Sequence, residues 1–168
     1  AIDWEAGDTV VRTDLEHSAG ILPWWNLERR GVEVRVAETE RGRLDLDALA
    51  DLLADAKLFC CNSITWNYGT ELPVAEIADI CEETDTYLLV DAVQSPGQTP
   101  VDVAEWGADF VAGAGHKWLL GPWGAGFLYV DSTVVEKTQP ATVGYRSVVD
   151  ANAAEPELKP NAGRFEVG

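Results

Sequence analysis

The amino-acid sequence predicts a three-layer α/β fold, in which a mostly parallel sheet is covered by helices on both faces. Short apolar segments alternate with segments of helical periodicity along most of the chain. The segment "TYLLVD", residues 86–91, is an almost unbroken apolar run, as expected of a strand covered on both faces. The repeated strand–helix–strand spacing implies right-handed crossovers, which place neighbouring strands parallel to one another.

The first half of the chain is predicted to alternate two strands with two helices. The strands are "TVVRT", residues 9–13, and "VEVRVA", residues 32–37, and the helix "ILPWWNLERR", residues 21–30, separates them. The segment "DLDALADLLADA", residues 45–56, is amphipathic. Asp45 is a plausible N-cap for this helix, because an aspartate side chain can accept hydrogen bonds from first-turn N–H groups.

The second half continues the same alternation. A helix is predicted over residues 73–85, and it starts with Pro73, which suits the first turn because its missing N–H would have no partner there. The remaining predicted elements are strands at 57–61, 86–91, 109–113 and 125–130 and a short helix at 103–107.

Beyond Asp131 the periodicity fades. Residues 138–163 contain three prolines and many small residues. This segment is too long to be a structureless loop within a closed domain. We therefore divide the chain into an α/β region, residues 1–137, and a connecting arm, residues 138–168. The chain has no methionine, begins with Ala1 and ends on "GRFEVG" without a closing element, so we expect both ends to be cut.

The chain is strongly acidic, with 29 acidic and 12 basic residues and a net charge of −17. The acidic residues are dispersed, which argues against nucleic acid or an anionic membrane as a partner. A dispersed acidic surface also predicts a halophilic protein, because concentrated salt screens the repulsion. No apolar run approaches the roughly 20 residues needed to span a bilayer, and no leader opens the chain, so we expect a soluble, cytoplasmic protein.

The three cysteines are Cys60, Cys61 and Cys81. An odd count with this spacing fits neither a disulfide framework nor a zinc site. We interpret them as small core residues in a reducing compartment. A metal site built from His17, His116 and the cysteines is disfavoured, because no pair has ligand spacing.

The candidate catalytic and binding residues lie at the ends of predicted strands, where ligands bind in open α/β sheets. Asp91 ends its strand, "EHSAG" (residues 16–20) follows the first strand, and His116 and Lys117 follow another. Lys117 is one of four lysines and lies in "VAGAGHKWLLGPWGAG", residues 111–126. This loop fails both common nucleotide-binding templates, because tryptophan stands at the third glycine position and also directly follows the lysine.

A lysine and a carboxylate at neighbouring strand ends suit pyridoxal phosphate. A lysine amine can form a Schiff base with the aldehyde, and an aspartate can pair with the pyridinium nitrogen. The nearby negative charge favours the protonated ring, which acts as the electron sink.

Four ordered segments carry a resemblance to a known family. Residues 88–130, "LLVDAVQSPGQTPVDVAEWGADFVAGAGHKWLLGPWGAGFLYV", resemble the cofactor-binding core of the class V aminotransferase family, a group of fold type I pyridoxal-phosphate enzymes. This group includes cysteine desulfurases, isopenicillin-N-epimerase-like proteins and kynureninase. The resemblance extends to residues 16–25, 65–77 and 164–168.

The resemblance implies a role for each of five residues. Lys117 would be the Schiff-base lysine, Asp91 the pyridinium partner and Gln94 a donor toward the phenolic oxygen of the cofactor. His17 would stack on the ring and His116 would help to hold the phosphate. The residues by themselves leave other interpretations open: Asp91 as a turn former, His17 as a capping or core histidine, and the other three as loop residues.

The chain departs from the family pattern at two positions. Ala114 stands where many relatives have a serine that contacts the phosphate. Relatives often have an asparagine three residues before the glycine of "GT", where this chain has Trp66 with Asn67 one place away. Asn67 or Thr65 could compensate, so Asn67 is a further candidate for cofactor binding. The pattern "TWNYGT" is more similar to the epimerase-like branch than to the desulfurases.

We therefore expect this chain to be the central part of the large domain of a pyridoxal-phosphate enzyme. The enzyme is expected to act on an amino acid or amino compound, as an aminotransferase, a cysteine desulfurase or an epimerase-like protein. The resemblance implies a homodimer, and an arm that leads to a C-terminal small domain outside the chain. No cysteine occupies the desulfurase nucleophile position. The isolated chain is expected to be inactive. The alternative is a non-catalytic α/β module that keeps the fold without productive cofactor binding.

Overall fold

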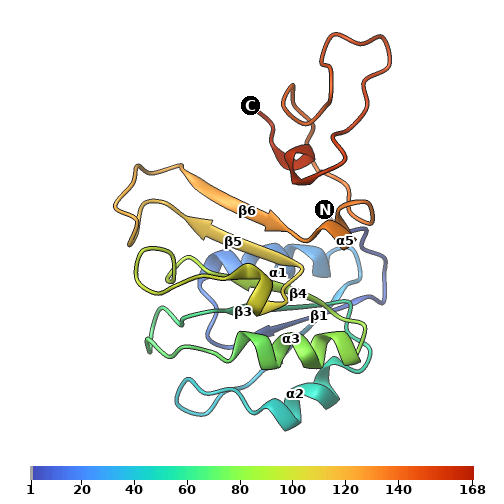
Figure 1. The fold of residues 1–168 in the computed structure, drawn as a ribbon. Coiled ribbons are helices and arrows are strands. Elements are labelled where there is room, and N and C mark those ends of the chain that lie inside the picture. The colour runs from blue at the N-terminus through green and yellow to red at the C-terminus, as the bar shows by residue number, and fades with distance from the viewer. Residues whose placement is uncertain (1) are drawn as a thin grey trace. The chain divides into compact units, whose positions relative to one another are not determined.

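A computed structural model describes residues 2–168 and contains a six-stranded sheet with the strand order β2-β1-β3-β4-β5-β6 (Figure 1). The strands are β1 (Thr9–Thr13), β2 (Glu33–Ala37), β3 (Leu58–Asn62), β4 (Tyr87–Asp91), β5 (Phe110–Ala114) and β6 (Gly126–Val130). The α-helices are α1 (Leu22–Glu28), α2 (Leu46–Leu53), α3 (Val74–Glu83), α4 (Val103–Trp106) and α5 (Ser132–Val135). Two 3₁₀ helices, η1 (Ser18–Gly20) and η2 (Ala162–Phe165), complete the elements.

The sheet is mostly parallel, as the sequence predicts. The pairs β1–β2, β1–β3, β3–β4 and β4–β5 are all parallel. Only β6 is drawn running opposite to its neighbour β5 (Figure 1). A mixed sheet with one antiparallel edge strand is common in α/β folds of this kind.

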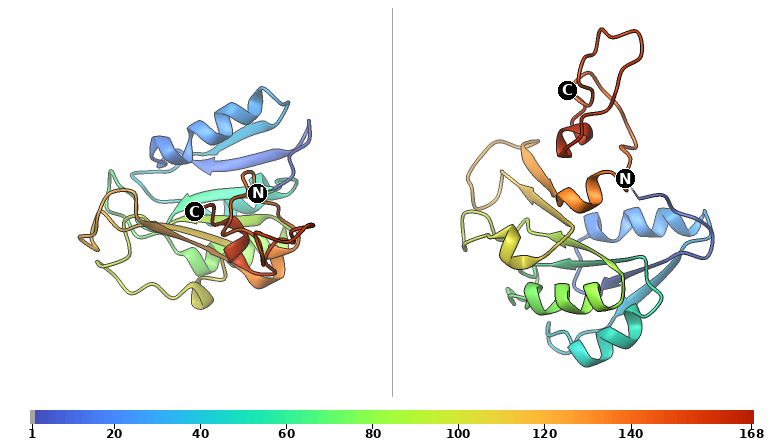
Figure 2. Two further views of the ribbon diagram at one scale, coloured as in Figure 1. Left: turned by 90° about the horizontal axis from the view of Figure 1, so that it is seen from above. Right: turned by 45° about the vertical axis from the view of Figure 1, so that its right-hand side comes forward.

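The winding of the sheet reverses beside β1. After β1 the chain crosses to β2 on one side, and it later returns to β3 on the other side of β1. Because right-handed crossovers in opposite directions place their helices on opposite faces, α1 covers one face while α2 and α3 cover the other (Figures 1 and 2). The carboxyl ends of β1 and β3 therefore form a topological switch point, where ligands bind in such sheets.

The helix and strand boundaries agree with the predicted ranges to within a few residues. The predicted N-cap is also confirmed, because the Asp45 side chain accepts hydrogen bonds from the N–H groups of Asp47 (3.1 Å) and Ala48 (3.3 Å). The sequence did not predict α5, which is a four-residue helix capped by Asp131. A helix this short contains too few residues for its periodicity to be recognised.

The most deeply buried part of the core lies between β3 and the helices α2 and α3. Every residue of β3 is buried, and Phe59, Leu53 and Ile77 are among the largest fully buried side chains. The three cysteines are free and buried, which confirms their interpretation as small core residues. Burial raises the pKa of Cys81 to about 12 and raises the pKa of Cys60 and of Cys61 well above the ordinary thiol value, so all three thiols are neutral.

The chain forms two compact units, of which the larger is Trp4–Leu128. The smaller contains Tyr129–Gly168 with the N-terminal end of the chain, and polar hydrogen bonds organise it. Within it, the buried Arg164 guanidinium donates to the backbone oxygens of Val135 (2.8 Å) and Lys159 (2.9 Å). The division at residues 137 and 138 and the role of the arm remain predictions. Among residues 2–168, no helix is both long and apolar enough to span a bilayer.

Candidate functional site

A pocket of about 340 Å³ opens at the carboxyl ends of the central strands, within the larger unit. Five of the six predicted site residues line it, namely His17, Asp91, Gln94, His116 and Lys117. Its other lining residues are Ala19, Asn62, Trp66, Val93, Ala114 and Trp123. Asn67 is not among them, whereas its neighbour Trp66 is.

Asp91 and Lys117 reach this pocket from adjacent strands. Asp91 is the last residue of β4, and its Oδ1 accepts a hydrogen bond from the N–H of Val93 (2.9 Å). Lys117 lies three residues after the end of β5, in a turn where its carbonyl accepts from the N–H of Leu120 (3.0 Å). Because both side chains line one cavity, the amine and the carboxylate can act on the same ligand.

The loops that follow β4 and β5 contact each other closely. Trp118 Nε1 donates to Gln94 Oε1 (3.0 Å). Gly97 has a φ of +89°, and a Cβ at this position would lie 2.6 Å from the carbonyl oxygen of Trp118. A side chain at this position would be strained by its φ and would collide with backbone. This glycine therefore permits the loop contact that holds Gln94 beside the lysine loop.

Aromatic rings form the side walls of the pocket. His116 stacks on Trp123, with ring centroids 3.9 Å apart and an interplanar angle of 17°. His17 meets Trp66 edge to face, with centroids 5.7 Å apart. The His17 Nδ1 also accepts from the N–H of Ala19 (3.3 Å) and thereby caps η1, so His17 has both the capping role that the sequence left open and a place in the pocket.

Asn62, which lines the pocket, and Glu16, which contacts Asn62, were not predicted. Asn62, the last residue of β3, is 3% exposed and lines the pocket. Its Nδ2 donates to Oε2 of the buried Glu16 (3.1 Å), whose Oε1 accepts from the Thr13 hydroxyl (2.7 Å). Burial, and to a smaller extent the negative charge of Asp91, raise the pKa of Glu16 to about 8. The only sequence signal was the position of Glu16 next to His17.

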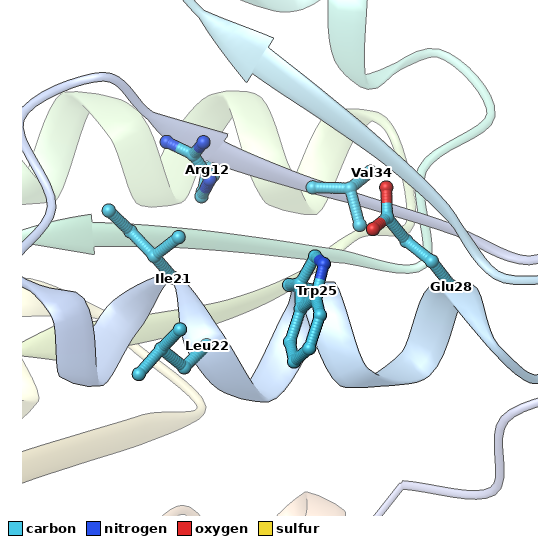
Figure 3. A pocket seen from close by; sticks show the side chains of 6 residues that line it. All are labelled: Arg12, Ile21, Leu22, Trp25, Glu28 and Val34. Atoms are coloured by element: carbon cyan, nitrogen blue, oxygen red, sulfur yellow. The ribbon is translucent and has the colours of Figure 1, made fainter.

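A second hollow, of about 310 Å³, lies between α1 and the neighbouring strands β1 and β2 (Figure 3). Its lining is Arg12, Ile21, Leu22, Trp25, Glu28 and Val34. The exposed fractions of Leu22 and Trp25 are 57% and 58%, so apolar side chains border this hollow.

Together, the winding of the sheet and the first pocket define an α/β protein whose candidate site lies at a topological switch point and presents a lysine and a carboxylate. A sequence model of the family described as "Aminotransferase class-V" matches residues 1–168. The chain therefore belongs to the class V aminotransferase family, as the sequence motifs indicated.

Proteins with similar sequences and structures include cysteine desulfurases and a cystine C–S lyase. The chain is 38% identical over 164 residues to a probable cysteine desulfurase from Methanothermobacter thermautotrophicus, an alignment that covers 96% of this chain and 41% of the relative. The structure matches the cystine C–S lyase C-DES in complex with cysteine persulfide with a TM-score of 0.90 at 32% identity, covering 99% of this chain and 46% of the lyase. It also matches a C-DES variant with glycine covalently linked to the PLP cofactor, with a TM-score of 0.90, 31% identity and the same two coverages.

The chain thus spans about two fifths of the length of the desulfurases it matches. These relatives are cysteine desulfurases, the branch that the pattern "TWNYGT" favoured less.

Proposed function

We propose that this chain forms the cofactor-binding part of a pyridoxal-phosphate enzyme that acts on an amino acid, with Lys117 as the lysine that holds the cofactor covalently. The observation that carries the proposal is that Lys117 and Asp91 line one pocket at the switch point of the sheet. The size of the pocket lies within the range of small-molecule sites. When bound, pyridoxal phosphate supplies an electron sink for negative charge at the substrate Cα.

The residues of the chain then have separate tasks. The Lys117 amine would hold the cofactor through its aldehyde and would move the proton at the substrate Cα. The Asp91 carboxylate keeps the proton on the ring nitrogen, because an opposite charge at close range favours the cationic form. We propose that His17 packs on the ring face, His116 contributes to the phosphate site and Gln94 donates to the phenolic oxygen.

The relatives favour a sulfur-containing amino acid as the substrate. The cysteines of this chain do not supply the nucleophile that accepts sulfur in a desulfurase, because all three are buried and their thiols are neutral. In a desulfurase, this chain would therefore act on the substrate Cα, and the thiolate that accepts sulfur would be a cysteine other than these three.

Borohydride reduction followed by peptide mapping tests the covalent role of Lys117. Reduction of the chain with bound pyridoxal phosphate should label the peptide that contains Lys117, and Lys117→Ala should abolish the label. Lys137→Ala is the matched control, because Lys137 is an exposed lysine of the smaller unit. A label on another lysine, or a label that survives Lys117→Ala, would contradict the proposal. Absence of saturable binding would favour the alternative of a non-catalytic α/β module.

We also propose that the chain associates through the exposed apolar side chains of its lysine loop. Leu120 is 89% exposed and Trp123 is 84% exposed, and Trp118, Leu119, Phe127 and Leu128 are exposed nearby in sequence. A cluster of this kind marks an interaction surface. Light scattering should give a dimer for the chain and a smaller species for Leu120→Ser, while a monomer at every concentration would contradict the dimer.

The acidic surface supports a protein adapted to concentrated salt. A net charge of −17 destabilises the folded chain by repulsion, which molar salt screens over about 3 Å. We expect the thermal midpoint to rise by several degrees between 0.1 and 2 M KCl. A midpoint that is independent of KCl would contradict this adaptation.

A further inference from the structure

We propose that Asn62 is a cofactor-contacting residue, whose Oδ1 forms with the Asp91 carboxylate a pair of acceptors for the protonated ring nitrogen of pyridoxal phosphate. This inference rests on the proposed function and adds a contact that neither the motifs nor the comparisons assign. It starts from one observation: Asn62 lines the pocket, is 3% exposed, and its Oδ1 has no hydrogen-bond partner within residues 2–168.

The sheet brings Asn62 and Asp91 to the same place. They end the neighbouring parallel strands β3 and β4 and are direct partners in the register. Residues paired in this way project from the same face of a sheet, because side chains alternate between the faces with a period of two. Both side chains line the pocket, so the amide oxygen and the carboxylate reach one ligand edge.

Glu16 sets the orientation of the Asn62 amide. The Asn62 Nδ2 donates to Glu16 Oε2 (3.1 Å), and Glu16 Oε1 accepts from the Thr13 hydroxyl (2.7 Å). Gly20 lies against the same carboxyl group, since a Cβ there would come within 2.6 Å of Glu16 Oε2. Both Glu16 oxygens act as acceptors in these contacts, so the carboxyl group holds the NH₂ end of the amide and leaves Oδ1 for the pocket.

The side chains of Asn62 and Asp91 favour a ligand with a cationic N–H donor. A buried carbonyl without a partner is costly in free energy, and a donor on the ligand removes that cost. Asp91 and Glu16 are both acids, and their charges interact. A protonated ring nitrogen satisfies the acceptor and offsets the negative charge of Asp91.

A ligand that lacks the ring nitrogen tests the contact. We expect Asn62→Ala to weaken binding of pyridoxal phosphate about tenfold and to leave binding of the 1-deaza analogue, in which C–H replaces the ring nitrogen, within about twofold. Asn26→Ala is the control, because Asn26 is an exposed asparagine on α1, and neither affinity should change. Equal losses for the two ligands in a folded Asn62→Ala chain, or no loss for either, would overturn the inference.

A second measurement uses the unsubstituted chain and therefore does not depend on how the variant folds. With ¹³C-labelled asparagine, the side-chain carbonyl resonance of Asn62 should shift downfield on addition of pyridoxal phosphate and remain in place with the 1-deaza analogue. An Asn62 resonance that responds equally to both ligands would overturn the contact. Failure of pyridoxal phosphate to bind through Lys117 would overturn the proposed function as well, whereas Lys117-dependent binding without the Asn62 effects would overturn this inference alone.

Discussion

The larger unit contains two hollows of similar size and opposite character. The pocket at the strand ends measures about 340 Å³ and the hollow beside α1 about 310 Å³. The first is lined by residues at the ends of several strands and presents an amine, a carboxylate, two amides and two imidazoles. The second is lined mainly by aliphatic and aromatic side chains, with Arg12 and Glu28 at its border (Figure 3).

The comparison shows that convergence of polar groups, and not volume, identifies the candidate site. Parallel strands end at the same edge of the sheet, so residues distant in sequence bring different chemical groups to one place. Most residues of the second hollow come from the short helix α1 or directly precede it. The exposed side chains of Leu22 and Trp25 offer apolar surface there, and few polar groups point toward a common ligand position. Substitutions in the first hollow, with matched substitutions in the second as controls, test this distinction.

The largest expected effect concerns Glu16 and the pH dependence of stability. Its pKa in the folded chain is about 8, above the ordinary value of 4.5, so between these pH values the folded chain holds a proton that the unfolded chain has released. Stability therefore falls as pH rises through this window, by at most about 5 kcal/mol at roughly 1.36 kcal/mol per pKa unit.

Urea unfolding of the chain between pH 4.5 and 8 measures this loss. Glu16→Gln should flatten the profile, because the amide does not titrate. Glu28→Gln in the second hollow should leave the profile unchanged, since Glu28 is exposed. A Glu16→Gln chain with the same slope as the unsubstituted chain would show that Glu16 is not the titrating group.

The next largest effect is expected at Asp91. Asp91→Asn removes the charge that stabilises the protonated ring, so the affinity for pyridoxal phosphate should fall about thirtyfold, or about 2 kcal/mol. Absorbance titration gives the dissociation constants. Glu28→Gln, the corresponding change from acid to amide beside α1, should leave the affinity unchanged. A similar loss in both variants would mean that overall charge, and not the pocket, determines binding.

The smallest effect is expected for a pair of exposed tryptophans. Trp123→Ala removes the ring on which His116 stacks, and we expect the affinity for pyridoxal phosphate to fall about threefold, since such ring pairs contribute about 0.5–1.5 kcal/mol. Trp25→Ala removes another exposed tryptophan ring, from the second hollow, and should not affect binding. Fluorescence titration of both variants measures the difference, and an equal loss would remove the distinction between the two hollows.

Five residues predicted from the sequence line the candidate pocket, because the motifs contain residues with recognisable chemistry at strand ends. Asp91, His116 and Lys117 follow buried strands, and the pocket brings them together with His17 and Gln94. Asn67 was proposed by counting along a loop, yet Trp66 lines the pocket in its place. Loop conformation decides which of two adjacent side chains faces a cavity, and periodicity does not apply there.

The alternation of apolar and amphipathic segments was sufficient to predict the sheet, its helices and the strand ends that carry the lysine and the carboxylate. These features depend on local periodicity and on the short-range rules of crossovers. The sequence alone did not reveal the floor of the pocket, because the buried state of Glu16 and the unpartnered oxygen of Asn62 arise only when β1, β3 and β4 lie side by side. Burial and register are properties of the assembled sheet, and they determine both the pKa of the acid and the direction of the amide.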